Sequence, residues 1–71
     1  MRVYITVREH ENIEYGYSID KLFTDYKEAQ ESLLQQGYHI LIKDYDIYMI
    51  DIDNEKGRDG YKYAIIYQKN L

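Results

Sequence analysis

The sequence predicts one α+β domain over residues 1–71, a mostly antiparallel sheet of about five strands with one helix on one face, in the chain order β-β-α-β-β-β. Three observations predict this class. Several short segments alternate apolar and polar residues, which is the period of a half-buried strand. One central segment changes to a period near four, which is the period of an amphipathic helix. Short polar stretches without proline or repeats join the segments, so a single layered domain is expected.

The first two strands are predicted from strict alternation. Residues 2–8 form the first, and its apolar parity is expected to make the helix-facing core: Val3, Ile5 and Val7. Residues 9–12 are polar and suit a turn. Residues 13–19 alternate again, which predicts a second strand hairpinned to the first. Its apolar parity holds Ile13, Tyr15, Tyr17 and Ile19.

The helix is predicted over residues 26–36. Asp25 followed three residues later by Glu28 fits a capping box, and Thr24 is a competing cap. Gly37 stands where a helix closes in the left-handed conformation. An apolar stripe faces the sheet and consists of Tyr26, Ala29, Leu33 and Leu34.

Three further strands are expected after the helix. Residues 38–43 and 44–51 alternate on either side of a break at Lys43 and Asp44. The second of them is apolar on both parities, so it is either central in the sheet or carries a bulge. The polar stretch from Asp53 to Gly60 ends in Asp-Gly, a hairpin signal, and residues 61–68 form the last strand.

One helix cannot cover a five-stranded sheet. Aromatic and aliphatic side chains on the far face must therefore meet water, a second copy of the chain or a partner. Parity places Tyr4 and part of the Tyr45 and Tyr48 pair on the side away from the helix.

The amino-acid composition excludes some classes of function and disfavours others. There is no cysteine, which excludes disulfides, thiolate metal sites and a thiol nucleophile. The chain has no apolar stretch of signal-peptide or membrane-span length, so a cytoplasmic location and no membrane partner are expected. Thirteen acidic residues face nine scattered basic ones, for a net charge of −4. That balance disfavours direct nucleic-acid binding and suits partners with basic surfaces.

The sequence offers no catalytic or metal-binding set, and we expect a protein that is not an enzyme and has no cofactor. The chain has two histidines, His10 and His39, but no Ser, Cys or carboxylate stands at a triad spacing from them. A calcium loop starting at Asp51 fails, because its sixth and twelfth positions are Lys56 and Lys62.

Residues 44–55 hold five carboxylates and no basic residue, interleaved with tyrosines. Such a surface can imitate the phosphates of nucleic acid and occupy a basic groove, with the tyrosines supplying contact area. The alternative is that the carboxylates solvate an exposed face and protect an edge strand. The candidate partner-binding residues are Asp44, Tyr45, Asp46, Tyr48, Asp51, Asp53 and Glu55.

The chain resembles small accessory proteins of bacteriophages and prophages. The likeness lies in Arg2-Val3-Tyr4-Ile5, the helix entry from Phe23 to Ala29, Gln36-Gly37-Tyr38 and the final Tyr-Ala-Ile-Ile-Tyr. The resemblance implies an inhibitor of a host nucleic-acid enzyme or defence system, with anti-CRISPR proteins among the examples, acting in the host cytoplasm. It transfers no site residues. Our leading hypothesis is therefore a protein-binding inhibitor. The alternatives are a homo-oligomeric module, such as a homodimer through the uncovered sheet face, and a small nucleic-acid-binding protein.

Overall fold

The α+β class is confirmed, because the described residues form one antiparallel five-stranded sheet and one α-helix. The structure is a computed structural model that describes residues 1–51 and 60–71. Its elements follow the chain in the order β1 (Arg2–Glu9), η1 (Ile13–Tyr15), β2 (Tyr17–Phe23), α1 (Tyr26–Gln35), β3 (His39–Ile42), η2 (Lys43–Tyr45), β4 (Ile47–Met49) and β5 (Tyr63–Asn70).

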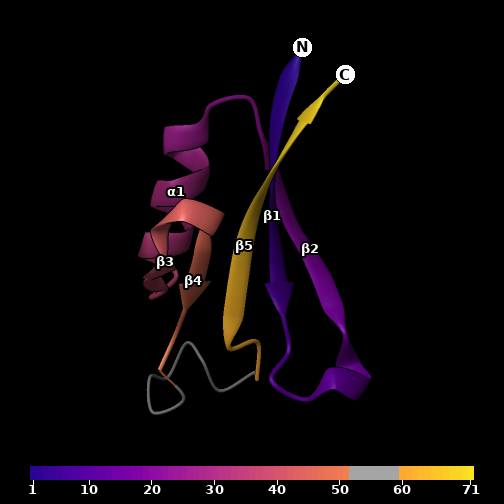
Figure 1. The fold of residues 1–71 in the computed structure, drawn as a ribbon, viewed down its shortest axis with the longest axis vertical. Coiled ribbons are helices and arrows are strands. Elements are labelled where there is room, and N and C mark those ends of the chain that lie inside the picture. The colour runs from indigo at the N-terminus through magenta and orange to yellow at the C-terminus, as the bar shows by residue number, and fades with distance from the viewer. Residues whose placement is uncertain (52–59) are drawn as a thin grey trace.

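The order of strands along the chain does not carry over to the sheet. The spatial order is β2-β1-β5-β4-β3, and every pairing is antiparallel. The first and last strands pair over their full length in the middle of the sheet. Both chain ends therefore lie together (Figure 1), and the Met1 and Leu71 backbones exchange hydrogen bonds of 2.8 and 2.6 Å.

The prediction that a second strand spans residues 13–19 is wrong in its first half. Ile13–Tyr15 form a 3-10 turn, in which Asn12 accepts hydrogen bonds from the Glu14 and Tyr15 N–H groups. Asparagine competes with strand pairing in this way because its side chain and backbone cap local turns. Gly16 then takes a left-handed φ of 64°, and the strand begins one residue later.

Helix α1 begins at a side-chain cap and ends at a glycine. Asp25 accepts a hydrogen bond from the Lys27 N–H at 2.9 Å, which satisfies one of the free donors of the first turn. At the other end Gly37 has φ 101°, and the Gly37 and Tyr38 N–H groups donate to the carbonyls of Leu34 and Leu33. This pairing is the Schellman motif, and it directs Tyr38 back into the core.

The prediction of a strand over residues 44–51 is largely wrong. Lys43–Tyr45 form a second 3-10 turn, and strand β4 covers Ile47–Met49 alone. The turn closes at Asp46, which has φ 53° and donates its N–H to the Lys43 carbonyl. Asp tolerates the left-handed region better than most residues. Residues 53–59 of the predicted hairpin loop lie outside the described residues. The last strand, β5, begins at Tyr63, two residues later than expected.

The core lies between α1 and one side of the sheet. On β1 this side carries Tyr4 and Thr6, which alternation predicted to face away from the helix. Tyr4 packs edge to face on Tyr26 of the helix, at 5.6 Å between ring centroids, and Thr6 is fully buried. Val3, Ile5 and Val7 alternate with these residues and belong to the other side of β1. Val3 is buried as predicted, at 3% exposure, whereas Ile5 and Val7 are only half-buried. The helix-side cluster consists of Ala29, Leu33, Tyr38, Tyr48, Ile50, Ala64 and Ile66.

Small side chains explain why the helix lies on this side. Thr6 lies on β1 and Ala64 on β5, and both are fully buried. Ala29 of the helix belongs to the same core cluster as Ala64. Short side chains on both elements let a helix approach a sheet closely. The more apolar parity carries larger, branched side chains. Apart from the buried Val3, α1 does not cover it.

Candidate functional site: the open face of the sheet

We call the side of the sheet that points away from α1 the open face. Residues paired across antiparallel strands project to the same side, so the pairing register defines its members. Val7, for example, pairs with Ile65 on one side and Ile19 on the other. The open face consists of Val3, Ile5, Val7, Glu9, Tyr17, Ile19, Leu22, His39, Ile42, Ile47, Met49, Tyr63, Ile65, Tyr67 and Lys69.

The large apolar side chains of the open face are exposed. The relative exposures are 67% for Tyr17, 74% for Ile19, 62% for Leu22, 48% for Tyr67 and 43% for Ile42. These five positions span from the edge strand β2 across the central β5 to the other edge strand β3. The apolar residues between them are half-buried. The result is a contiguous apolar surface across the sheet.

A β-bulge in β2 sets which of its residues reach this surface. Thr6 pairs with Lys21 and Val7 pairs with Ile19, so Asp20 is the extra residue between them. An extra residue shifts the alternation by one. It places both Ile19 and Leu22 on the open face, although simple alternation would put them on opposite sides.

The same bulge explains how Thr6 can be fully buried. Its hydroxyl accepts a hydrogen bond from the Lys21 N–H at 3.1 Å and lies 3.2 Å from a carboxylate oxygen of Asp20. Asp20 in turn accepts a hydrogen bond of 3.0 Å from the side chain of Gln36 at the end of α1. A buried hydroxyl with partners costs little, so this network locks the helix to the bulge.

The charged groups of the open face stand at opposite ends of the two central strands. Glu9 pairs with Tyr63 at one end, and Lys69 pairs with Val3 at the other. On each strand, six residues separate the Glu9–Tyr63 pair from the Val3–Lys69 pair, which corresponds to about 20 Å along the strand. Between these pairs the described positions of β1 and β5 on this face are apolar.

The predicted acidic surface is only partly assembled. Asp44, Tyr45 and Asp51 are exposed, and the first two lie in η2, between Ile42 and Ile47 of the open face. Tyr48, in contrast, is 1% exposed and belongs to the core, where its hydroxyl accepts a 3.0 Å hydrogen bond from Gln30. The interpretation of Tyr48 as a contact residue is therefore wrong. Asp53 and Glu55 lie outside the described residues.

Asp46 is tied to the helix rather than presented to solvent. Its carboxylate accepts a hydrogen bond from the Tyr26 hydroxyl, and its backbone carbonyl accepts from the Ile66 N–H. The bond to the carboxylate, together with burial, raises the pKa of Tyr26 well above the usual tyrosine range. This pair joins the helix start to the η2 turn.

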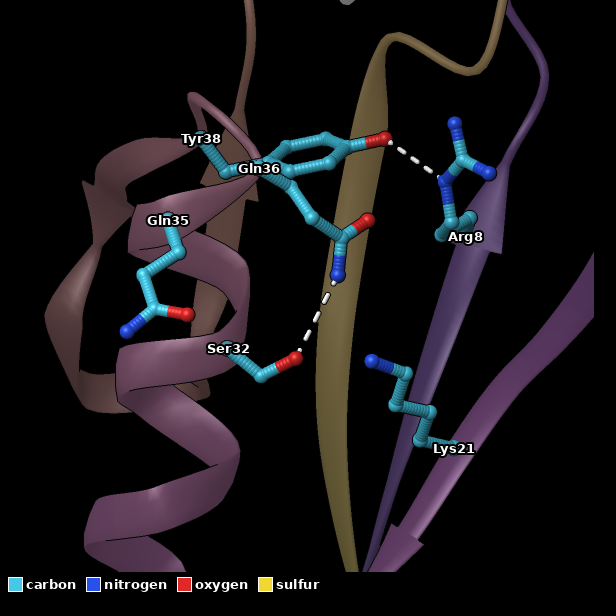
Figure 2. A pocket seen from close by; sticks show the side chains of 6 residues that line it. All are labelled: Arg8, Lys21, Ser32, Gln35, Gln36 and Tyr38. Atoms are coloured by element: carbon cyan, nitrogen blue, oxygen red, sulfur yellow. Dashed lines mark hydrogen bonds between the residues drawn. The ribbon is translucent and has the colours of Figure 1, made fainter.

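A polar cleft of about 340 Å³ opens between the end of α1 and strands β1 and β2. Figure 2 shows Arg8 and Lys21 on the sheet side, facing Ser32 and Gln36 on the helix side. The Arg8 side chain donates to the Tyr38 hydroxyl at 3.1 Å, which itself donates to the Tyr61 carbonyl at 2.5 Å. These hydrogen bonds join the C-terminal end of the helix layer to the sheet.

The two histidines occupy different environments. The Nδ1 atom of His10 accepts a hydrogen bond from the Asn12 N–H at 2.9 Å, and its ring packs on Tyr15 and Tyr61. His39 lies on the edge strand β3 within the open face. Among residues 1–51 and 60–71, no three His, Asp, Glu or Cys side chains group as metal ligands. No helix in that part of the chain is long and apolar enough to cross a membrane.

Comparison with known proteins assigns the chain to no family. No family model, curated protein or solved structure matches the chain. The open face must therefore be interpreted from its own chemistry.

Sequence reasoning predicted an uncovered face but assigned the wrong parity to it. One signal for the correct parity was the small size of Thr6 and Ala64, which share a face with the apolar stripe of the helix. The polar residues that flank Val3, Ile5 and Val7 favour the wrong parity, because polar side chains commonly face solvent. Those polar residues, Thr6 and Arg8, instead make the hydrogen bonds beneath the helix.

Proposed function

We propose that this protein is a non-enzymatic protein-binding module whose recognition surface is the open face of the sheet. The observation that carries the proposal is the exposure of Tyr17, Ile19, Leu22 and Tyr67 on one continuous face. Soluble monomers rarely expose contiguous apolar patches of more than a few hundred Å² without a partner. Tyrosines among branched aliphatic residues, with few charges, are also typical of the centre of a protein interface.

The acidic residues fit this proposal as part of the rim. Asp44 and Tyr45 border the open face at the η2 corner, where a partner seated on the face would meet them. Interfaces commonly have an apolar centre with a polar rim, and rim charges act mainly on the association rate and on salt dependence. Contact with a basic partner and the role of a phage-encoded inhibitor stay predictions.

Site-specific photo-crosslinking in cells tests the proposal. A photoreactive phenylalanine analogue replaces Tyr17 on the open face, Leu34 on the outer surface of α1, or Tyr45 in the acidic turn. All three positions are exposed, so substitution leaves the core intact. The proposal predicts protein adducts from position 17 and none from position 34.

Two results would contradict it. Absence of adducts from position 17, with the protein folded and expressed, would remove the open face as a recognition surface. Adducts from position 45 without adducts from position 17 would move recognition to the acidic turn.

A further inference from the structure

We propose that the occupant of the open face is a second copy of this chain, forming a two-fold symmetric dimer with antiparallel strands across the interface. This inference rests on the proposed function, because it names the partner of the same surface. Two sheets would pack face to face, with the two helices on the outside. Aligned sheets pack about 10 Å apart in this way, with side chains interdigitating between them.

The size of the open face matches what a stable dimer needs. Taking on the order of 200 Å² for a fully exposed Tyr, Leu or Ile side chain, the five most exposed members present roughly 600 Å². The half-buried apolar members of the face add to this area. A standard stable interface buries about 800 Å² per partner, so the five exposed members alone supply most of that area.

The charges of the open face are self-complementary in one orientation. A two-fold axis that lies between the sheets and perpendicular to the strands reverses strand direction from one copy to the other. The end of the sheet that carries Glu9 then lies over the end that carries Lys69 in the second copy. A two-fold axis parallel to the strands would instead place the Glu9 ends of both copies together and the Lys69 ends of both copies together. Like charges repel, so the antiparallel arrangement is favoured.

The same register places apolar groups at the centre. The level midway between Glu9 and Lys69 falls at the pair of Thr6 and Ile66. On the open face this level lies between Ile5 and Val7 on β1 and between Ile65 and Tyr67 on β5. Tyr67 therefore stands near the two-fold axis, where aromatic residues contribute most to binding.

The edges of the sheet are poorly suited to self-association. Edge strand β2 carries the bulge at Asp20 next to Lys21, and edge strand β3 has four residues and a register shift of its own. Bulges, charges and short length each prevent an edge from pairing with another strand. The face, rather than an edge, is the surface that can bury apolar area between two copies.

The first test is the mass of the purified chain by light scattering and sedimentation between low and high micromolar concentration. The proposal predicts a dimer that dissociates on dilution. Tyr67→Lys places two ammonium groups near the axis and should raise the dimer dissociation constant by about a hundredfold. Ile19→Lys, on the most exposed member, provides a second variant if Tyr67→Lys fails to fold. Leu34→Lys on the outer surface of α1 is the matched control and should leave the dimer unchanged.

A charge-swap cycle tests the orientation. Glu9→Lys alone and Lys69→Glu alone each set like charges opposite one another twice in the dimer, so each should weaken it by about tenfold at low salt. The double variant restores both pairs and should return the dissociation constant to within about threefold of the parent. Circular dichroism shows whether each variant is folded.

The outcomes separate this inference from the proposed function. A monomer at high micromolar concentration, or a dimer unaffected by both Tyr67→Lys and Ile19→Lys, would overturn the inference. If position 17 then crosslinks in cells to a different protein, the proposed function still stands. If position 17 gives no adduct at all, both fail. A dimer without rescue in the double variant would overturn the antiparallel arrangement.

Discussion

The two faces of the sheet differ in what their side chains require. The covered face combines small side chains such as Ala64 and the hydrogen-bonded Thr6 with buried Ile50 and Ile66. Its tyrosines have hydroxyls that find hydrogen-bond partners. The open face is built from larger aliphatic and aromatic residues that bond to nothing polar, such as Ile19 and Leu22. The comparison teaches that the more apolar parity of a strand need not be the folded core. A face that receives a helix needs room, and small side chains such as Thr6 and Ala64 provide it.

The largest expected effect is the difference in unfolding free energy between a core substitution and a substitution on the open face. Leu33→Ala removes a fully buried side chain beneath the helix and should cost about 2–5 kcal/mol of unfolding free energy. That is comparable to the whole stability of a domain of this size. Ile19→Ala on the open face should change the stability of the monomer by less than about 0.5 kcal/mol. Urea denaturation at low protein concentration measures both, and similar losses would contradict the distinction between the faces.

The next effect concerns the buried hydroxyl. Thr6→Val keeps the shape of the side chain but removes the acceptor of the Lys21 N–H bond and the contact to Asp20. Leaving a buried group without its partner should cost about 1–3 kcal/mol. Thr24→Val, at an exposed position, is the control. Equal stability of Thr6→Val and the parent would show that the bulge network does not hold the helix in place.

A smaller effect depends on pH. The folded-state pKa of Tyr26 lies above the unfolded value of about 10, so folding favours the protonated phenol. Its contribution is fully present below pH 10 and is lost as the pH rises above that value, because the unfolded chain then releases the proton first. Tyr26→Phe should flatten the fall in stability above pH 10 relative to the parent. Chemical denaturation between pH 8 and 11 measures this, and parallel curves would contradict the role of Asp46.

The smallest effect on stability is expected at the acidic rim. Asp44→Asn combined with Asp51→Asn removes two exposed carboxylates and should change the unfolding free energy by less than about 0.5 kcal/mol. Its effect should appear instead in the salt dependence of partner binding, which becomes flatter if the partner is basic. Crosslinking yield from position 17, compared at low and high salt, measures this. A large stability loss would mean that these groups belong to the fold.

Local signals predicted the elements that depend on local chemistry. Alternation located β1, and the Asp25 cap and Gly37 bounded the helix near its observed ends. The errors arose where a competing local interaction won. Asn12 closed a turn within the expected second strand, and the left-handed Asp46 ended a turn within the expected fourth. Both residues favour such turns, and alternation alone did not weigh them against pairing.

The candidate acidic surface shows why site prediction from parity is harder. Asp44 and Tyr45 lie at the surface as expected, whereas Tyr48 is in the core, because β4 presents it opposite Ala64 beneath the helix. A tyrosine suits either environment, since its ring packs and its hydroxyl needs one partner. Gln30 supplies that partner from the helix, and no feature near Tyr48 in the sequence indicates it.

By itself, the sequence determined the α+β class, the single helix, the chain order of the strands and the existence of an uncovered apolar face. These follow from periodicity, capping and the ratio of one helix to five strands, which are properties of short segments or of composition. Only the tertiary structure decided which face is open. That choice depends on pairing β1 with β5, on the bulge at Asp20 and on the packing of Ala29 with Ala64 in the core. Such contacts join residues far apart in the chain, so no local pattern carries them.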